Sequence, residues 1–247
     1  MATSTVYATK MVGKGENTRT LILHQALSMA LRSSLDSLTI ATIADEMKMS
    51  KTGVFARFGS REKLQLGVLR LYRERFEQAV LFPAAEAEPG LPRLISMFQH
   101  WVQFEVSGFE SGSIYISGAV EYENRTGPLR DALVAMIADW QAALRQCVDM
   151  AIHLGHLSAD TDAAQFIYEV YGLILGMHHD MRVLRRAGSA QRSVNAFNRL
   201  LFNAGVPNAD RFSEKLKDAI EQKCEIRRAS PTAVSPLIPG SLPRTWA

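Results

Sequence analysis

The sequence predicts an all-α protein built from two helical domains. Apolar residues recur every three or four positions through most of the chain, which is the spacing of one face of an α-helix. From Leu91 onward, no convincing alternation of apolar and polar residues indicates a strand. The ten residues Pro83 to Pro92 contain three prolines and a glycine. Because a helix does not continue comfortably through such a segment, we expect the domain boundary there.

Composition and charge are those of a folded protein with a basic N-terminal part. Hydrophobic residues make up 47% of the 247 residues and charged residues 21%. Residues 1–81 contain twelve Lys and Arg against seven Asp and Glu, whereas the remainder is slightly acidic. A positive excess at one end suits contact with phosphates, although a difference this small can also arise by chance.

The cysteines do not indicate a metal site, and the apolar segments do not indicate export. Cys147 and Cys224 are isolated, so neither a disulfide framework nor a zinc cluster is expected. No apolar run approaches the length of a membrane span, and the first residues lack a signal-peptide core. We therefore expect a cytoplasmic protein.

The first two elements are an arm and a helix. Residues 1–15 show little periodicity and predict a flexible basic arm, which is either a disordered tail or a contact to phosphates and the minor groove through Lys10 and Lys14. A helix is expected from about Thr18 to Ser33. Its inward stripe would consist of Leu21, Ile22, Ala26, Met29 and Ala30.

Residues 38–58 predict two short helices that meet at a tight turn. Thr39 can cap the first helix and Ser50 the second, where Val54 and Phe58 lie four residues apart and can anchor it. The exposed side between these anchors is polar and cationic, as in a helix that enters the major groove. This window alone is equally consistent with any pair of short helices in an all-helical domain.

The rest of the chain predicts further helices and a tail. Ser60 is the expected N-cap of a longer helix that runs to about Phe82. Later helices are expected near 92–107, 113–124, 128–155, 160–187, 189–204 and 208–225. These elements divide the chain into an arm (1–15), an N-terminal domain (16–82), a C-terminal domain (91–225) and a disordered tail (226–247).

Residues from about Asn17 to Leu66 resemble the TetR (tetracycline-repressor) family of bacterial transcription regulators. The matching positions are Thr18-Arg19, Ile22-Leu23, Ala26, Leu38-Thr39-Ile40, Ile43-Ala44, Met49-Ser50-Lys51, Val54-Phe55, Phe58 and Ser60-Arg61-Glu62-Lys63-Leu64. The resemblance implies a three-helix N-terminal domain with a DNA-binding helix-turn-helix at 39–58. It also implies a larger helical domain that binds an effector and dimerises. Ser34 stands where the family usually has Gly, so the turn after the first helix must form without one.

The resemblance also implies roles in DNA binding for individual residues. The expected contact residues are Arg19, Thr39, Ser50, Lys51, Thr52, Gly53, Phe55, Arg57 and Arg61. Lys51 and Thr52 would reach base edges, and Arg57 and Arg61 would hold phosphates. Phe55 replaces a Tyr common in the family and lacks its hydroxyl, so we expect Phe55 to pack. The alternative for Lys51, Arg57 and Arg61 is a solvated cationic face.

Aromatic and soft residues in the second domain are candidate effector contacts. The candidates are Phe98, Trp101, Tyr115, Met136, Trp140, Tyr171 and His178. Side chains of this kind at helical spacing usually pack into a core, but a cavity between the helices would bind an apolar or amphipathic small molecule. His178 and His179 are adjacent and lack a spaced partner ligand, so no metal site is expected.

The helix near 160–187 contains two glycines that can allow close packing. Gly172 and Gly176 remove side-chain bulk from one face, which serves either packing within the chain or a partner helix. The family resemblance favours a homodimer through helices 160–187 and 189–204.

Together these features predict a dimeric repressor that binds a palindromic operator and is released by a small ligand. A ligand-responsive activator, or an architectural DNA-binding protein without an effector, is the alternative. No convergent set of titratable residues indicates an enzyme, and no cofactor is expected.

Overall fold

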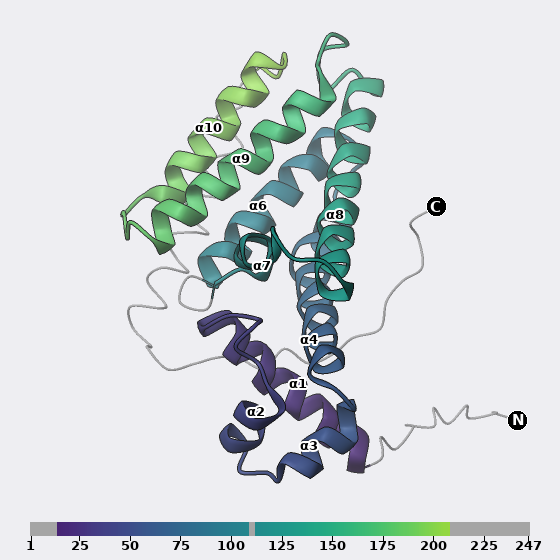
Figure 1. The fold of residues 1–247 in the computed structure, drawn as a ribbon. Coiled ribbons are helices and arrows are strands. Elements are labelled where there is room, and N and C mark those ends of the chain that lie inside the picture. Colours follow the sequence, from purple (N-terminus) through teal and green to yellow (C-terminus); the bar gives the residue numbers. More distant parts are fainter. Residues whose placement is uncertain (1–13, 109–111, 208–247) are drawn as a thin grey trace, which may run out of the picture.

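The computed structural model describes residues 14–108 and 112–207, and within these ranges the chain is all-helical, without strands (Figure 1). This confirms the predicted fold class. The elements are α1 (Lys14–Arg32), α2 (Ile40–Glu46), α3 (Lys51–Phe58), α4 (Arg61–Phe76), the π-helical turn η1 (Glu77–Leu81), α5 (Phe82–Ala85), α6 (Leu91–Ser107), α7 (Ile114–Tyr122), α8 (Pro128–His153), α9 (Ala163–Arg182) and α10 (Ser189–Asn203).

Several predictions at the two ends fall outside the described residues. The helix expected near 208–225, the tail from residue 226 and the first thirteen residues of the arm are among them. At the other end of that arm, α1 begins at Lys14 rather than Thr18. Lys14 and Gly15 therefore belong to a helix.

The N-terminal helices α1, α2 and α3 and the first turns of α4 form a unit that we call the head. Its helices begin where the sequence predicts caps: the hydroxyl of Thr39 accepts a hydrogen bond from the Thr42 N–H, that of Ser50 from Gly53, and that of Ser60 from Lys63, all at 3.0 Å. Each cap satisfies an N–H that has no partner inside the helix. These contacts fix the points at which the chain changes direction.

A small apolar core holds the head together. The buried residues are Ile22, Ala26, Leu38, Ile43, Val54, Phe58 and Leu64. Leu21 is an exception to the predicted stripe, because 56% of its side chain is exposed. Ile22 and Ala26, four residues apart, set the buried face of α1, and Leu21 lies outside it.

The turn after α1 forms without a left-handed residue at Ser34. Among the described residues other than glycine, only Lys48 and Arg185 have a positive φ. The Ser34 hydroxyl instead accepts a hydrogen bond from the Ser37 N–H at 3.0 Å, and the Ser37 hydroxyl donates to the Ser34 carbonyl at 2.7 Å. Two serines therefore supply the local bonds that close this turn.

The helix that leaves the head is longer than predicted. It continues from α4 through η1 into α5 and ends at Ala85, three residues beyond the expected end near Phe82 and inside the Pro83–Pro92 segment. Pro83 is the second residue of α5, which directly follows the π-helical turn. The chain turns at Gly90, whose φ of 84° a side chain would strain.

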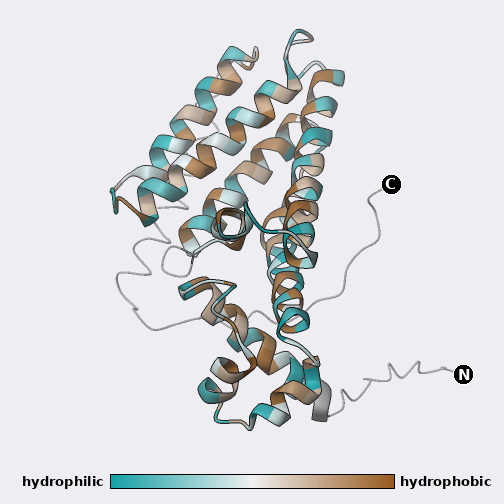
Figure 2. Ribbon diagram, in the orientation of Figure 1, coloured by the Kyte–Doolittle hydropathy of each residue, from teal (hydrophilic) through white to brown (hydrophobic). Residues whose placement is uncertain are grey.

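The C-terminal helices surround the larger part of the hydrophobic core, which is continuous with that of the head. α4 packs against α8, α8 against α6, and α9 pairs with α10 at one edge of the molecule (Figure 1). Hydrophobic residues, in brown, and hydrophilic ones, in teal, alternate along these helices (Figure 2). The predicted helices from 92 to 204 are therefore confirmed, each to within a few residues of its expected ends.

Candidate DNA-binding and effector-binding sites

The outer face of α3 presents Lys51, Thr52 and Phe55. All three are exposed, and the Phe55 ring is 53% exposed. The expectation that Phe55 packs is therefore wrong. Val54 and Phe58 are both buried and define the inner face of α3, and each residue turns about 100° around a helix, so Phe55 points away from that face.

Gly53 and Arg57 form part of the local structure of α3. A Cβ at Gly53 would come within 3.0 Å of the Ser50 hydroxyl, which caps the helix. The Arg57 guanidinium folds back and donates from one Nη to the Gly53 carbonyl at 2.5 Å. Reaching a phosphate requires Arg57 to leave this carbonyl, whereas Lys51 already stands free at the first turn.

Arg19 and Thr39 also border the head. The Arg19 guanidinium carbon lies 5.0 Å from the centre of the Phe58 ring, in a cation–π contact. Thr39 is the N-cap of α2 and forms a capping box with Thr42. Both side chains thus have structural partners near the end of α3 and the start of α2.

Arg61 makes a set of bonds that the sequence did not indicate. Its Nε donates to the Leu38 carbonyl at 2.9 Å, and its Nη2 donates both to the Asp36 carbonyl and to the Asp36 carboxylate. The guanidinium expected to hold a phosphate thus ties together the turn between α1 and α2.

The same turn is bonded to the C-terminal helices through Glu121 of α7. One carboxylate oxygen of Glu121 accepts from the Asp36 N–H at 2.5 Å and the other from the Leu35 N–H at 3.1 Å. The buried Gln65 amide donates to the Leu35 carbonyl at 2.8 Å. We call this set the junction; it consists of Leu35, Asp36, Arg61, Gln65, Glu121 and Arg125.

Arg125 completes the junction by an ion pair. Its Nη1 lies 2.9 Å from Asp36 Oδ1, the same oxygen that Arg61 Nη2 approaches at 2.7 Å. The hydrogen bond from Arg125, aided by the two positive charges, holds the pKa of Asp36 below its ordinary value. One acidic side chain of the head is therefore shared by cations from both parts of the molecule.

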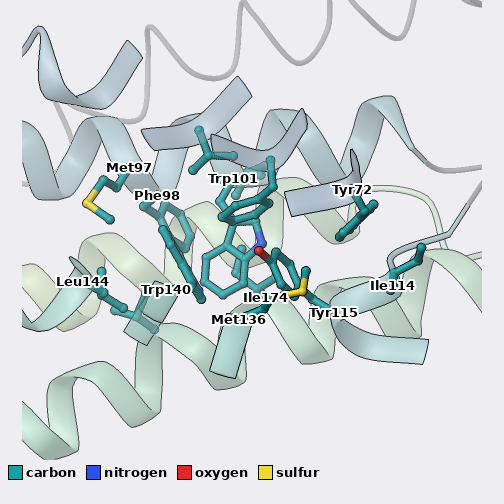
Figure 3. Close-up of a cluster of buried hydrophobic side chains, with 14 of the residues drawn as sticks. Tyr72, Met97, Phe98, Trp101, Ile114, Tyr115, Met136, Trp140, Leu144 and Ile174 are labelled. Carbon is teal, nitrogen blue, oxygen red and sulfur yellow. The ribbon is translucent and has the colours of Figure 1, made fainter. Parts of the chain in front are cut away.

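The interior of the C-terminal helices is rich in aromatic rings. Figure 3 shows Trp101, Tyr115 and Trp140 close together, with Met136 and Ile174 beside them. The Trp101 and Trp140 rings lie 4.6 Å apart, and Trp101 and Tyr171 5.7 Å. Five predicted contact residues, Trp101, Tyr115, Met136, Trp140 and Tyr171, thus belong to one cluster.

A pocket of about 370 Å³ opens beside this cluster. Tyr115, Met136 and Trp140 line it, together with residues that the sequence did not single out: Arg73, Phe76, Glu77, Leu81, Phe82, Asp139, Ala142, Ala143 and Gln146. Phe98, Trp101, Tyr171 and His178 are not among the lining residues. Phe98 stacks on Phe197 with ring centres 3.9 Å apart.

His178 pairs with a buried acid that the sequence reasoning missed. Its Nδ1 lies 3.0 Å from Glu105 Oε2, and the other Glu105 oxygen is buried without a hydrogen-bond partner. In the part of the chain that the structure describes, no three His, Cys, Asp or Glu residues gather as metal ligands. Within the same residues, no helix is long and apolar enough to cross a membrane.

One face of α9 is exposed and has little bulk. A Cβ at Gly172 or Gly176 would meet nothing within 4 Å, so neither glycine serves packing within the chain. Tyr168 on the same helix is 75% exposed and Phe202 of the neighbouring α10 is 68% exposed. Apolar side chains beside open glycines are what a partner helix would cover.

Comparisons with known proteins agree with this arrangement. Residues 90–197 match the family model described as the tetracyclin repressor-like C-terminal domain. No curated protein sequence matches the chain.

Solved structures with the same fold include a TetR transcriptional regulator from Chloroflexus aurantiacus, with a TM-score of 0.68 and 20% identity over 76% of this chain and 94% of that one. A TetR-family regulator from Cytophaga hutchinsonii has a TM-score of 0.69 and 14% identity over 79% and 98%. AibR, solved in complex with isovaleryl coenzyme A and operator DNA, has a TM-score of 0.62 and 19% identity over 74% and 97%.

A helix-turn-helix head joined by one long helix to a helical domain is the fold of the TetR-family regulators compared above. Within this fold, residues 90–197 match the C-terminal domain of the tetracyclin repressor-like proteins.

Proposed function

We propose that the protein is a dimeric repressor that binds a palindromic operator through α3 and leaves it when a small molecule occupies the pocket beside Trp140. The observation that carries the DNA-binding part is the face of α3. It is capped by Ser50, anchored by Val54 and Phe58, and exposes Lys51, Thr52 and Phe55. A helix presented in this way suits the major groove.

Each exposed residue of α3 has a chemistry suited to a base edge. A Lys donates to guanine acceptors, a Thr hydroxyl can bond to either type of pair, and an apolar ring can contact a thymine methyl group. Arg57 and Arg19 would hold phosphates after leaving their contacts to Gly53 and Phe58. Arg61 would act through the junction, where it positions the turn before α2.

Selection of bound sequences from a random DNA pool tests this function. We expect a palindromic site to be enriched, because two heads of a dimer meet two half-sites related by the same symmetry. Enrichment of sequences without symmetry would contradict the dimeric mode. A repressor, an activator and an architectural protein are then distinguished by transcription from that site with and without small molecules.

Lys51→Ala is expected to weaken binding to the selected site by about 1–3 kcal/mol and to relax the base preference at one position of each half-site. Fluorescence anisotropy with the selected duplex and with single-base variants measures both effects. Arg145→Ala, which removes a surface cation of α8 paired with Asp149, is the control and should leave the affinity unchanged. Equal losses in the two variants would count against a base-reading role for Lys51.

Gly172→Arg is expected to weaken the dimer by about 1–3 kcal/mol, or about five- to 150-fold, because the new side chain would overpack the partner helix. The folded monomer should be unaffected, since nothing lies within 4 Å of the added Cβ. Sedimentation analysis over a range of concentrations measures the dissociation constant. Ala135→Arg, at an exposed position of α8, is the control, and an undiminished dimer in Gly172→Arg would place the interface elsewhere.

A further inference from the structure

The pocket beside Trp140 lies where the helix from the head meets α8. Its walls come from the last turn of α4, from η1, from the start of α5, from Tyr115 of α7 and from α8. Its volume of about 370 Å³ is at the lower end of the range for small-molecule sites, roughly 300–1,000 Å³. A compact ligand therefore suits it.

Three charged side chains stand at this pocket, and two of them are acidic. Arg73 Nε lies 2.7 Å from Glu77 Oε1, and Arg73 Nη1 lies 2.8 Å from Asp139 Oδ2. Among the described residues that line the pocket, Arg73 is the only cation. One positive charge shared by two carboxylates leaves the lining with an excess of one negative charge.

Aromatic rings make up much of the remaining wall. Phe76, Phe82, Tyr115 and Trp140 all line the pocket, and the Phe76 ring lies 4.8 Å from Tyr115 and 5.0 Å from Trp140. Burial raises the pKa of Tyr115, so its phenol stays neutral and contributes no further charge. Ring faces attract cations, and the attraction grows when the cation is shielded from water.

We propose that the effector of this protein is a lipophilic organic cation, whose apolar body lies against Phe76, Tyr115 and Trp140 and whose charge lies near Glu77 and Asp139. This inference rests on the proposed function, in which the pocket is the effector site. The cation competes with Arg73 for the carboxylates of Glu77 and Asp139. It also neutralises the one negative charge that Arg73 alone does not balance.

An anionic effector such as an acyl coenzyme A fits this lining poorly. Its phosphates could bind only Arg73 here, and Arg73 is already paired with two carboxylates. The same phosphates would be repelled by the negative charge in excess. The lining of this chain therefore points away from the ligand class bound by AibR, despite the shared fold.

The position of Glu77 connects the ligand to the head. Glu77 is the first residue of η1 and Leu81 the last, and both line the pocket. π-Helical turns within α-helices are frequently found at functional sites. At Glu77 the hydrogen-bond pattern of the helix changes from α to π. A cation that draws Glu77 away from Arg73 would therefore act on this point. The same helix begins at Arg61, which belongs to the junction.

Two isosteric ions of opposite charge test the proposal on the full-length protein. Tetraphenylphosphonium and tetraphenylborate have the same shape, so the difference between them reports charge alone. Calorimetric titration should show at least tenfold tighter binding of the phosphonium, and anisotropy with the selected duplex should show release of DNA by it. Equal affinity, or tighter binding of the borate, would overturn the proposal.

Neutral variants of Glu77 and Asp139 test whether these two carboxylates bind the cation. Glu77→Gln and Asp139→Asn should each weaken phosphonium binding about tenfold, and the double variant should prefer the borate. Glu86→Gln removes an exposed acid at the end of α5, outside the lining, and should bind the phosphonium as the parent protein does. Circular dichroism verifies that η1 tolerates the change at Glu77, and Asp139→Asn provides the same test at a more exposed position.

Failure of the proposal can be told apart from failure of the proposed function. Release of DNA by isovaleryl coenzyme A, with no binding of the phosphonium, would overturn the cationic class while the repressor function stands. Loss of sequence-specific DNA binding in the absence of any ligand would overturn the function itself. Weaker phosphonium binding in Glu86→Gln than in Glu77→Gln would show that the ion binds outside this pocket, which also overturns the proposal.

Discussion

Replacing Glu121 by alanine is expected to lower the free energy of unfolding by about 2–3 kcal/mol and to loosen the head from the C-terminal helices. The reason is that one carboxylate accepts hydrogen bonds from two backbone N–H groups, those of Leu35 and Asp36. A donor left without a partner costs about 1–3 kcal/mol when buried, and less where water can reach it, as it can at this half-buried site.

Hydrogen exchange and urea unfolding measure the two parts of this prediction. The amides of Leu35 and Asp36 should exchange at least tenfold faster in Glu121→Ala, whereas amides in the middle of α8 should keep their rates. Glu123→Ala is the matched control, because Glu123 is exposed and its carboxylate accepts a side-chain bond only from the adjacent Asn124. Similar exchange rates at Leu35 in the two variants would contradict the bonding described.

In the proposed function, the junction would also couple the effector to the head. A ligand shifts an equilibrium only by its difference in affinity for two states, and the proposal requires these states to differ in the position of the head. With the bonds of Glu121 removed, the heads of Glu121→Ala should bind DNA with a weaker dependence on effector.

Replacing Phe76 by alanine is expected to lower the free energy of unfolding by about 3–5 kcal/mol. Phe76 is 1% exposed, and its ring makes edge contacts with four others, at centre distances of 6.4 Å to Trp101, 5.3 Å to Phe104, 4.8 Å to Tyr115 and 5.0 Å to Trp140. Removing the ring leaves a cavity that these side chains can fill only in part.

Thermal unfolding followed by near-ultraviolet circular dichroism detects the loss, because Trp101 and Trp140 report on this core. Phe55→Ala is the control: it removes the same ring from an exposed position and should cost less than about 1 kcal/mol. A similar loss of stability in both variants would mean that Phe76 is not packed as described.

Local features of the fold could be predicted from the sequence, and nonlocal ones could not. The caps at Thr39, Ser50 and Ser60 depend on residues three positions away, so the sequence pattern contains all the information needed. Val54 and Phe58 could be assigned to one buried face of α3 for the same reason, because they lie four residues apart. The Glu121 bonds join residues 85 and 86 positions apart, and no local pattern relates them.

The predicted DNA-contact residues illustrate a second limit. The caps and the buried face of α3 were predicted, but the exposure of Phe55 was not. Arg57 and Arg61 were expected to hold phosphates, and the contacts that they make here, to Gly53 and to Asp36 and Leu38, were not foreseen. A guanidinium has five donors and a long stem, so its partners depend on the acceptors that tertiary structure places near it.

The pocket illustrates a third limit. Aromatic residues at helical spacing identified part of its wall, namely Tyr115, Met136 and Trp140. The sequence did not indicate the charged residues of the pocket, Arg73, Glu77 and Asp139. In the sequence pattern they resemble ordinary exposed residues on the polar faces of helices. Only the crossing of α4 and η1 with α8 places them together.

The π-helical turn at Glu77–Leu81 has a geometric consequence for the whole regulator. Its hydrogen bonds span five residues instead of four, so it holds a residue more than an α-helical turn would. Because one residue corresponds to about 100° of rotation about a helix axis, this surplus sets the angle at which the head is presented relative to α8. Loss of a single residue between Glu77 and Leu81 would turn the head by about that angle and carry Asp36 away from Glu121. The direction of the α3 face that we propose to bind DNA thus depends on the number of residues in a turn about twenty positions further along the chain.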